Sequence, residues 1–144
     1  MDTQKKENKA EEYLNNWKRA EADLINYKKE ERDREKKALE FGKEVVILDF
    51  VEIMDDLEEA LRSNKPDEHQ SNTGYRDGIE MTLKKFISVL ERYGVKRIET
   101  KGEKFNPEIH EAISGEGGMI KEEIRTGYTM HDKVIRPARV IINQ

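Results

Sequence analysis

The side chains that could perform chemistry are few, and they are widely spaced along the chain. The sequence has no cysteine, which excludes disulfides, thiolate metal sites and cysteine nucleophiles together. Of its three histidines, His69 lies in a polar stretch and His131 stands beside Asp132 in a predicted turn. His110 could act as a catalytic base by pairing with a neighbouring glutamate. A histidine that fixes a local turn by hydrogen bonds is the favoured interpretation.

Patterns that bind metals or phosphates are also missing from the sequence. No two histidines lie near each other, and the glutamate-rich helices lack a Glu–His pair at helical spacing facing inward. The stretch Ser114–Gly118 is glycine-rich but lacks the lysine of a phosphate-binding loop, so a hairpin loop is predicted. We therefore expect no catalytic residue, no metal and no cofactor: the chain is predicted not to be an enzyme.

Charge is balanced along the chain, and this bears on possible partners. Residues 28–37 are ten consecutive charged residues, four of them acidic, with no aromatic among them, and the net charge of the chain is −4. A nucleic-acid binder typically presents a clustered basic surface with aromatic side chains. A solvated helix face is favoured for this run, and no nucleic-acid partner is expected.

The sequence offers no sign of a membrane partner. No stretch approaches the roughly 20 apolar residues that span a bilayer, and no apolar segment follows the N-terminal charges. Together with the absence of cysteine, this predicts a cytoplasmic protein.

A long helix must carry most of the charge. Only 35% of residues are hydrophobic and 40% are charged, so a long solvated helix or a core shared between copies is expected. Residues 11–62 contain no proline and one glycine, Gly42. Apolar residues there recur at alternating steps of four and three, the seam of a coiled coil, which predicts self-association. The seam includes Leu24 and Leu48, and residues 1–12 are expected to form a short disordered tail.

A bundle and a small β domain are predicted to follow. Beyond Gly42 the apolar stripe broadens, and a second helix is expected over residues 75–93, with Leu83 on its apolar face and Gly94 as its stop. Two such helices per chain, doubled by dimerisation, make a four-helix bundle, so residues 13–94 form the coil and bundle. From Val95, short β-rich runs punctuated by glycines predict an all-β domain over residues 95–144. The fold class is α+β.

Four segments resemble the GrpE family, in the same order along the chain. The most specific is the segment 127–140, which reads Gly-Tyr, a turn, and then Ile-Arg-Pro-Ala-Arg-Val. Residues 106–113 resemble the family's Pro-x-x-His-x-Ala segment, residues 78–95 its second bundle helix, and residues 22–29 the Asn-aromatic-basic-basic patch of its long helix. The resemblance covers about residues 13–142.

The resemblance implies a homodimeric co-chaperone of the heat-shock response that binds the ATPase domain of the DnaK chaperone and accelerates ADP release. The positions that match the family's chaperone contacts on the β domain are Phe105, Pro107, Ile124 and Ile142, with core packing an equal alternative for the phenylalanine and the isoleucines. On the long helix they are Lys28 and Lys29. Structural positions implied by the motifs are Gly78, where a side chain would intrude on bundle packing, Tyr128 and Arg136.

Two other functions stay open from the residues alone. The first is a scaffold or adaptor dimer whose coiled coil tethers two β modules and which has no effect on nucleotide. The second is a nucleic-acid-binding dimer.

Overall fold

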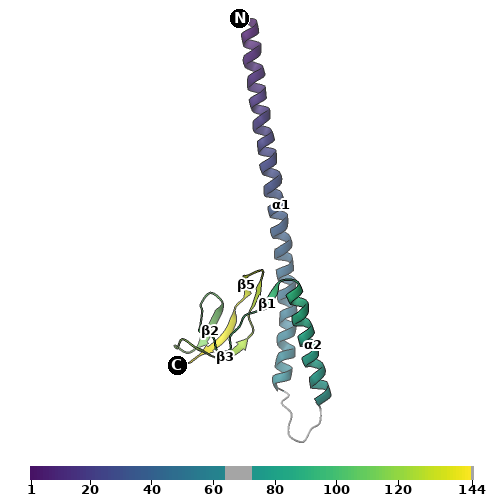
Figure 1. The fold of residues 1–144 in the computed structure, drawn as a ribbon, viewed down its shortest axis with the longest axis vertical. Helices are drawn as coiled ribbons and strands as arrows, with labels where there is room; N and C mark the ends of the chain where they lie inside the picture. The colour runs from purple at the N-terminus through teal and green to yellow at the C-terminus, as the bar shows by residue number, and fades with distance from the viewer. Residues whose placement is uncertain (64–72, 144) are drawn as a thin grey trace. The chain divides into compact units, whose positions relative to one another are not determined.

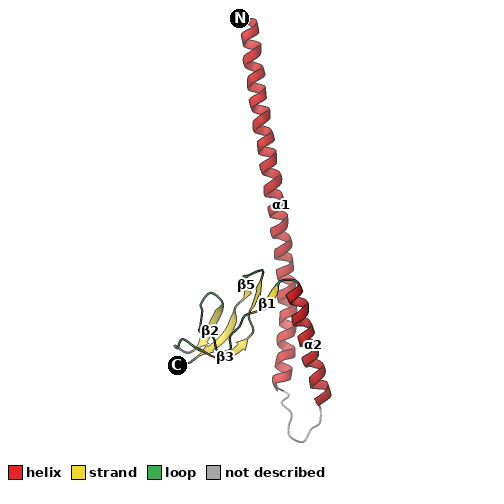
Figure 2. Ribbon diagram, viewed as in Figure 1, coloured by secondary structure: helices red, strands yellow, loops and turns green. Residues whose placement is uncertain are grey.

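The computed structural model describes residues 1–63 and 73–143, and the predicted loop between the helices lies mostly outside them. The chain divides into two compact units, residues 1–43 and 44–144. Helix α1 (Asp2–Ser63) and helix α2 (Thr73–Arg92) are followed by six strands (Figures 1 and 2). The predicted α+β class, with a long N-terminal helix, a second helix and a C-terminal all-β region, is confirmed.

Helix α1 differs from the prediction at its start. It begins at Asp2, so the residues that we expected to form a disordered tail are helical. Residues 2–12 contain no proline or glycine and are rich in lysine, glutamate and alanine, all strong helix formers. An acidic residue in the first turn, Asp2, also favours a helix start.

The first unit buries nothing within a single chain. All of residues 1–43 are described, and none of their side chains is buried. The large seam residues Trp17 and Leu24 are 59% and 51% exposed. A solvated helix with an uncovered apolar stripe is the state that the four–three spacing predicts for one copy taken alone.

The strands form two three-stranded sheets. What we call the inner sheet has the antiparallel order β1 (Val95–Arg97), β4 (Tyr128–Met130), β5 (Lys133–Arg136). The outer sheet has the order β2 (His110–Ser114), β6 (Ala138–Ile142), β3 (Ile120–Arg125), in which β2 runs parallel to the central strand and β3 antiparallel. The β4–β5 turn has positive φ at His131 and Asp132, which confirms the predicted turn.

The two sheets belong to different cores. The inner sheet shares one core with both helices: the buried members are Val51, Met54, Leu83, Leu90, Val95, Tyr128 and Met130. The outer sheet is organised around a second core, formed by Ile98, Ile120, Ala138 and Val140. The inner sheet is therefore packed onto the helices, while the outer sheet is built on its own apolar residues.

Candidate partner-binding surface and its junction with the helices

The four predicted contact residues of the β domain are not equally accessible. Ile124 on β3 is 38% exposed and Pro107 is exposed, whereas Phe105 is partly buried against the outer core. Ile142 is only 6% exposed and lies opposite Ile120 in the β3–β6 register. Ile124 on the outer sheet and Pro107 in the turn before β2 are thus accessible, and the core alternative applies to Ile142.

Two exposed apolar side chains on the outer sheet were missed by sequence reasoning. Ile113 on β2 is 55% exposed, and Met119, just before β3, is 41% exposed. A single apolar residue on a short strand has no sequence signal that separates a solvent-facing position from a core position. Together with Ile124, they give the outer sheet several uncovered apolar side chains.

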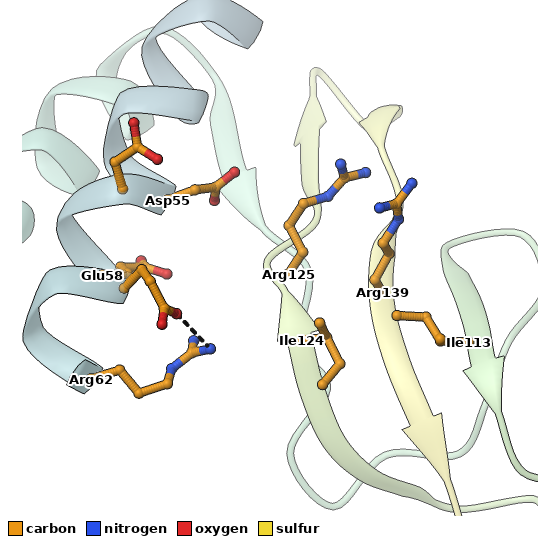
Figure 3. A pocket seen from close by; sticks show the side chains of 9 residues that line it. Asp55, Glu58, Arg62, Ile113, Ile124, Arg125 and Arg139 are labelled. Carbon is orange, nitrogen blue, oxygen red and sulfur yellow. Dashed lines mark ion pairs between the residues drawn. The ribbon is translucent and has the colours of Figure 1, made fainter.

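A cleft separates helix α1 from the outer sheet (Figure 3). Its volume is about 280 Å³. The helix wall carries mainly carboxylates and the sheet wall carries two isoleucines and two arginines; the lining residues are Asp55, Asp56, Glu58, Glu59, Arg62, Ile113, Ile124, Arg125 and Arg139. Burial, reinforced by repulsion from Arg136 and Arg139, lowers the pKa of the Arg125 guanidinium.

Arg136 connects helix α1 to the place where the chain crosses between the two sheets. This crossing consists of residues 126–127, between β3 and β4, and residue 137, between β5 and β6. Its guanidinium donates to both carboxylate oxygens of Asp55, at 2.6 and 2.8 Å. Its Nε and Nη2 also donate to the carbonyl oxygen of Thr126, at 3.1 and 2.7 Å. Arg136 is 8% exposed, so this is a charge-assisted, bidentate and largely buried contact.

The Tyr128 ring lies close to two arginines. The guanidinium carbons of Arg97 and Arg136 lie 6.0 and 5.3 Å from its centroid, within cation–π range. Arg97 in turn forms an ion pair with Glu58 of α1. Two α1 carboxylates, from Asp55 and Glu58, therefore hold the two guanidinium groups beside one buried ring.

Burial of Tyr128 also sets its protonation. The ring is 1% exposed, and among the described residues its hydroxyl makes no hydrogen bond of good geometry, although the Arg97 side chain lies near it. Burial raises the pKa of the Tyr128 phenol, although Arg97 pulls it down, so the neutral form is favoured. Burial lowers the pKa of Arg97, but attraction to Tyr128 and Glu58 outweighs it and the net shift is upward.

Gly127 permits the two chain segments that connect the sheets to approach each other closely. A Cβ added to Gly127 would overlap the backbone of Ala138, lying 2.8 Å from its Cα. Ala138 itself is fully buried. The Gly-Tyr and Arg-Pro-Ala elements of the sequence signature therefore meet at this crossing.

His110 has a structural role. It is buried, its Nδ1 accepts from the backbone N–H of Asn106 at 3.0 Å, and its Nε2 lies 3.3 Å from the carbonyl oxygen of Glu99. With Nδ1 as acceptor, Nε2 carries the proton and donates to Glu99. This agrees with a histidine that fixes a turn, since both nitrogens are engaged by the backbone.

The remaining predicted residues lie on the helices. Lys28 and Lys29 are exposed on the first unit. Leu48 is half-buried, and Leu83 is buried in the core shared with the inner sheet. A Cβ at Gly78 would meet nothing within 4 Å in the same chain, so its predicted role in packing of the dimeric bundle stays a prediction.

No group of three or more histidine, aspartate or glutamate side chains that could hold a metal occurs in the described parts of the chain. Within those same parts, no helix is both long and apolar enough to cross a membrane.

Comparison with known proteins agrees with these features. The GrpE family model matches residues 2–144. Proteins named Protein GrpE are similar to the chain: that of Alkalilimnicola ehrlichii is 34% identical over 94% of this chain and 65% of its own length. That of Bdellovibrio bacteriovorus is 32% identical over 96% and 83%, and that of Methanobrevibacter smithii 35% over 90% and 71%. The chain spans just under two thirds of the first of these relatives.

The family match extends over both helices and both sheets, and it includes the crossing at which Gly127, Tyr128 and Arg136 meet. The chain belongs to the GrpE family.

Proposed function

We propose that this chain is a nucleotide exchange factor that binds the ATPase domain of a DnaK-type chaperone and accelerates ADP release, without performing chemistry itself. The observation that carries the proposal is the family match over residues 2–144. It is supported by the outer sheet, which leaves Ile113, Met119 and Ile124 uncovered by its own core. We expect this activity in the cytoplasm, as predicted from the sequence.

The proposed mechanism is selection of an open chaperone. A binder speeds ADP release only when it binds the open ATPase cleft more tightly than the closed one. A hundredfold acceleration needs about 2.7 kcal/mol of such preference. Exposed ion pairs from Lys28 and Lys29 would contribute little and would weaken with salt. Burial of apolar side chains such as Ile124 and Ile113 is the larger available source.

We also propose that two copies associate through the helices. Within one chain, Val46, Phe50 and Ile53 of α1 and Met81 of α2 are each about half or more exposed. A helix pair that leaves such side chains uncovered is completed economically by a second pair, which gives a four-helix bundle. A dimer would also cover the seam residues of the first unit.

Release of a fluorescent ADP analogue from DnaK, with and without this protein, tests the function. The expected result is a concentration-dependent acceleration. Ile124→Asp should lower the stimulated rate at least tenfold, because a charged side chain would replace an apolar contact. Lys121→Asp, an exposed change on the same strand, is the matched control and should retain activity.

The rival functions predict different outcomes in the same experiment. An adaptor would bind the chaperone without changing the ADP release rate. A nucleic-acid binder would show salt-dependent retention on DNA and no effect on the chaperone. An unchanged rate with wild-type protein at saturating concentration would reject the proposed function.

A further inference from the structure

Two acidic residues of α1 reach the β domain from the same face of the helix. Asp55 and Glu58 are three positions apart, so their side chains lie one above the other. Asp55 forms an ion pair with Arg136, and Glu58 with Arg97. The carboxylates are mostly buried, with side chains 26% and 21% exposed. Screening by solvent is therefore reduced compared with a surface pair.

The Arg136 contact continues into the outer sheet. The Thr126 carbonyl that accepts from Arg136 directly follows β3. The Thr126 hydroxyl donates to Glu123 at 3.0 Å, and the Thr100 hydroxyl donates to the other oxygen of Glu123 at 2.6 Å. A chain of polar contacts thus runs from Asp55, across the crossing between the sheets, to strand β3 of the outer sheet.

Apolar packing does not hold the outer sheet against α1 as it holds the inner sheet. Among the described residues, no helix residue belongs to the outer core. The cleft lies between α1 and Ile113, Ile124, Arg125 and Arg139 (Figure 3). The direction of the outer sheet relative to the helices therefore depends on the crossing itself. The contacts of Asp55 and Glu58 tie α1 to that crossing, while the Lys133–Glu44 ion pair joins α1 to β5 of the inner sheet.

We propose that Asp55 and Glu58 are positioning residues for nucleotide exchange: through Arg136 and Arg97 they fix the direction in which the outer sheet meets the chaperone. This inference rests on the proposed function. A rigidly held sheet can fit the open ATPase cleft and exclude the closed one. A loosely held sheet would adapt to both forms, and the preference that accelerates ADP release would shrink even though binding persisted.

This role predicts which kinetic quantity changes. Asp55→Asn and Glu58→Gln should each lower the plateau of stimulated ADP release at saturating protein by about threefold, and together by about tenfold. The concentration for half-maximal effect should change less than the plateau. Asp49→Asn and Glu52→Gln, exposed residues of the same helix with no ion pair in the described parts of the chain, are the matched controls.

A charge exchange keeps the test valid if single variants fold poorly. Glu58→Arg alone places two cations together, and Arg97→Glu alone places two anions together. The double variant restores an attractive pair of reversed sign. The plateau should fall at least fivefold in each single variant and return to within twofold of wild type in the double variant. A double variant as impaired as the singles would overturn the proposal.

A distance measurement tests the positioning independently of the chaperone. Because the chain has no cysteine, spin labels can be placed uniquely at Lys85→Cys on α2 and Lys121→Cys on β3, both exposed. Doubly labelled protein diluted with unlabelled protein reports distances within one chain. Adding Asp55→Asn and Glu58→Gln should broaden the distance distribution, while adding the Asp49 and Glu52 changes should leave it unaltered.

The two readouts separate failure of this inference from failure of the proposed function. If wild-type protein does not accelerate ADP release, the exchange function is wrong. If it does, a lowered plateau with an unbroadened distribution contradicts positioning, as does a broadened distribution with an unchanged plateau. A circular-dichroism melt confirms that each variant is folded at the assay temperature.

Discussion

Tyr128 combines two roles that conflict energetically. Its ring lies within cation–π range of the guanidinium groups of Arg97 and Arg136, which favours burial of the aromatic ring. Its hydroxyl, however, is buried and makes no hydrogen bond of good geometry among the described residues, although the Arg97 side chain lies near it. An unsatisfied buried hydroxyl costs about 1–3 kcal/mol. The residue therefore contributes through its ring and is penalised for its hydroxyl.

Tyr128→Phe keeps the ring and removes the hydroxyl. We expect the free energy of unfolding to rise by about 1 kcal/mol, because an unsatisfied polar group is lost while the stacking remains. Urea unfolding at a fixed protein concentration measures this change. Tyr93→Phe, at an exposed tyrosine, is the control and should change stability little. A loss of stability in Tyr128→Phe would mean that the hydroxyl is bonded in solution.

The same variant has a pH signature. The folded pKa of Tyr128 is raised, so the unfolded chain loses this proton first, at about pH 10. Stability contributed by the neutral phenol is fully present below that pH and is lost as the pH rises toward the folded pKa. Wild type should therefore lose stability more steeply than Tyr128→Phe above about pH 10, and the two should run parallel at neutral pH.

Gly127→Ala tests the close approach at the crossing. The added Cβ would overlap backbone atoms of Ala138, which cannot move as a side chain would. We expect a loss of about 2–3 kcal/mol in unfolding free energy, measured by urea. Gly118→Ala is the matched control, because its Cβ would meet nothing within 4 Å. Equal effects at the two glycines would contradict the packing argument.

Sequence reasoning identified Gly127, Tyr128 and Arg136 but could not name their partners. Asp55 lies 81 residues from Arg136, and Glu58 lies 39 residues from Arg97. In the sequence both acids are ordinary members of a charged helix, where solvated carboxylates are the usual case. Only the fold distinguishes them from Asp49 or Glu52. Ile142 shows the same limit, because a chemical type alone does not separate a surface contact from a core residue.

At the scale of elements, the helices were predictable and the strand pairing was not. The four–three spacing and the glycine at 94 indicated α1 and α2 directly from local sequence. The pairing of β2 with β6, parallel and many residues apart, leaves no local signal. The helical start at Asp2 was missed because a short tail was expected before the coil, although residues 2–12 favour a helix.

Gly42 lies within the continuous helix α1, beside the boundary between the two compact units. We expect Gly42→Ala to stabilise the helix by about 1 kcal/mol, because the glycine is exposed and its Cβ would meet nothing within 4 Å. In a thermal scan followed by circular dichroism, an early helix transition should precede loss of the bundle. Gly42→Ala should raise the midpoint temperature of this early transition.

The control for this helix variant is Gly94→Ala. Gly94 has a φ of +78°, and an added Cβ would overlap the imidazole ring of His131, so stability should fall. A single transition that reports helix and bundle together, unmoved by Gly42→Ala, would contradict independent opening of the long helix.

At the scale of the whole molecule, association is the main expectation. Light scattering at micromolar concentration should give the mass of a dimer. Leu48→Asp should shift the mass toward the monomer, because burying an unpaired carboxylate in the interface costs several kcal/mol unless it stays neutral. Lys101→Asp, exposed in the β domain, is the control. A monomer mass for wild type would reject the shared four-helix bundle.

The central position of β6 has a consequence for synthesis of the protein on the ribosome. Strands β2 and β3 do not pair with each other; both pair with β6, which comes last in chain order. Residues 110–125 leave the ribosome before residues 138–142 do, so for a time their shared partner is still inside the exit tunnel. The helices can form from local sequence during this interval, but the outer sheet must wait for residues 138–142. The outer sheet, and with it the proposed chaperone-binding surface, is thus the last part of the chain to form.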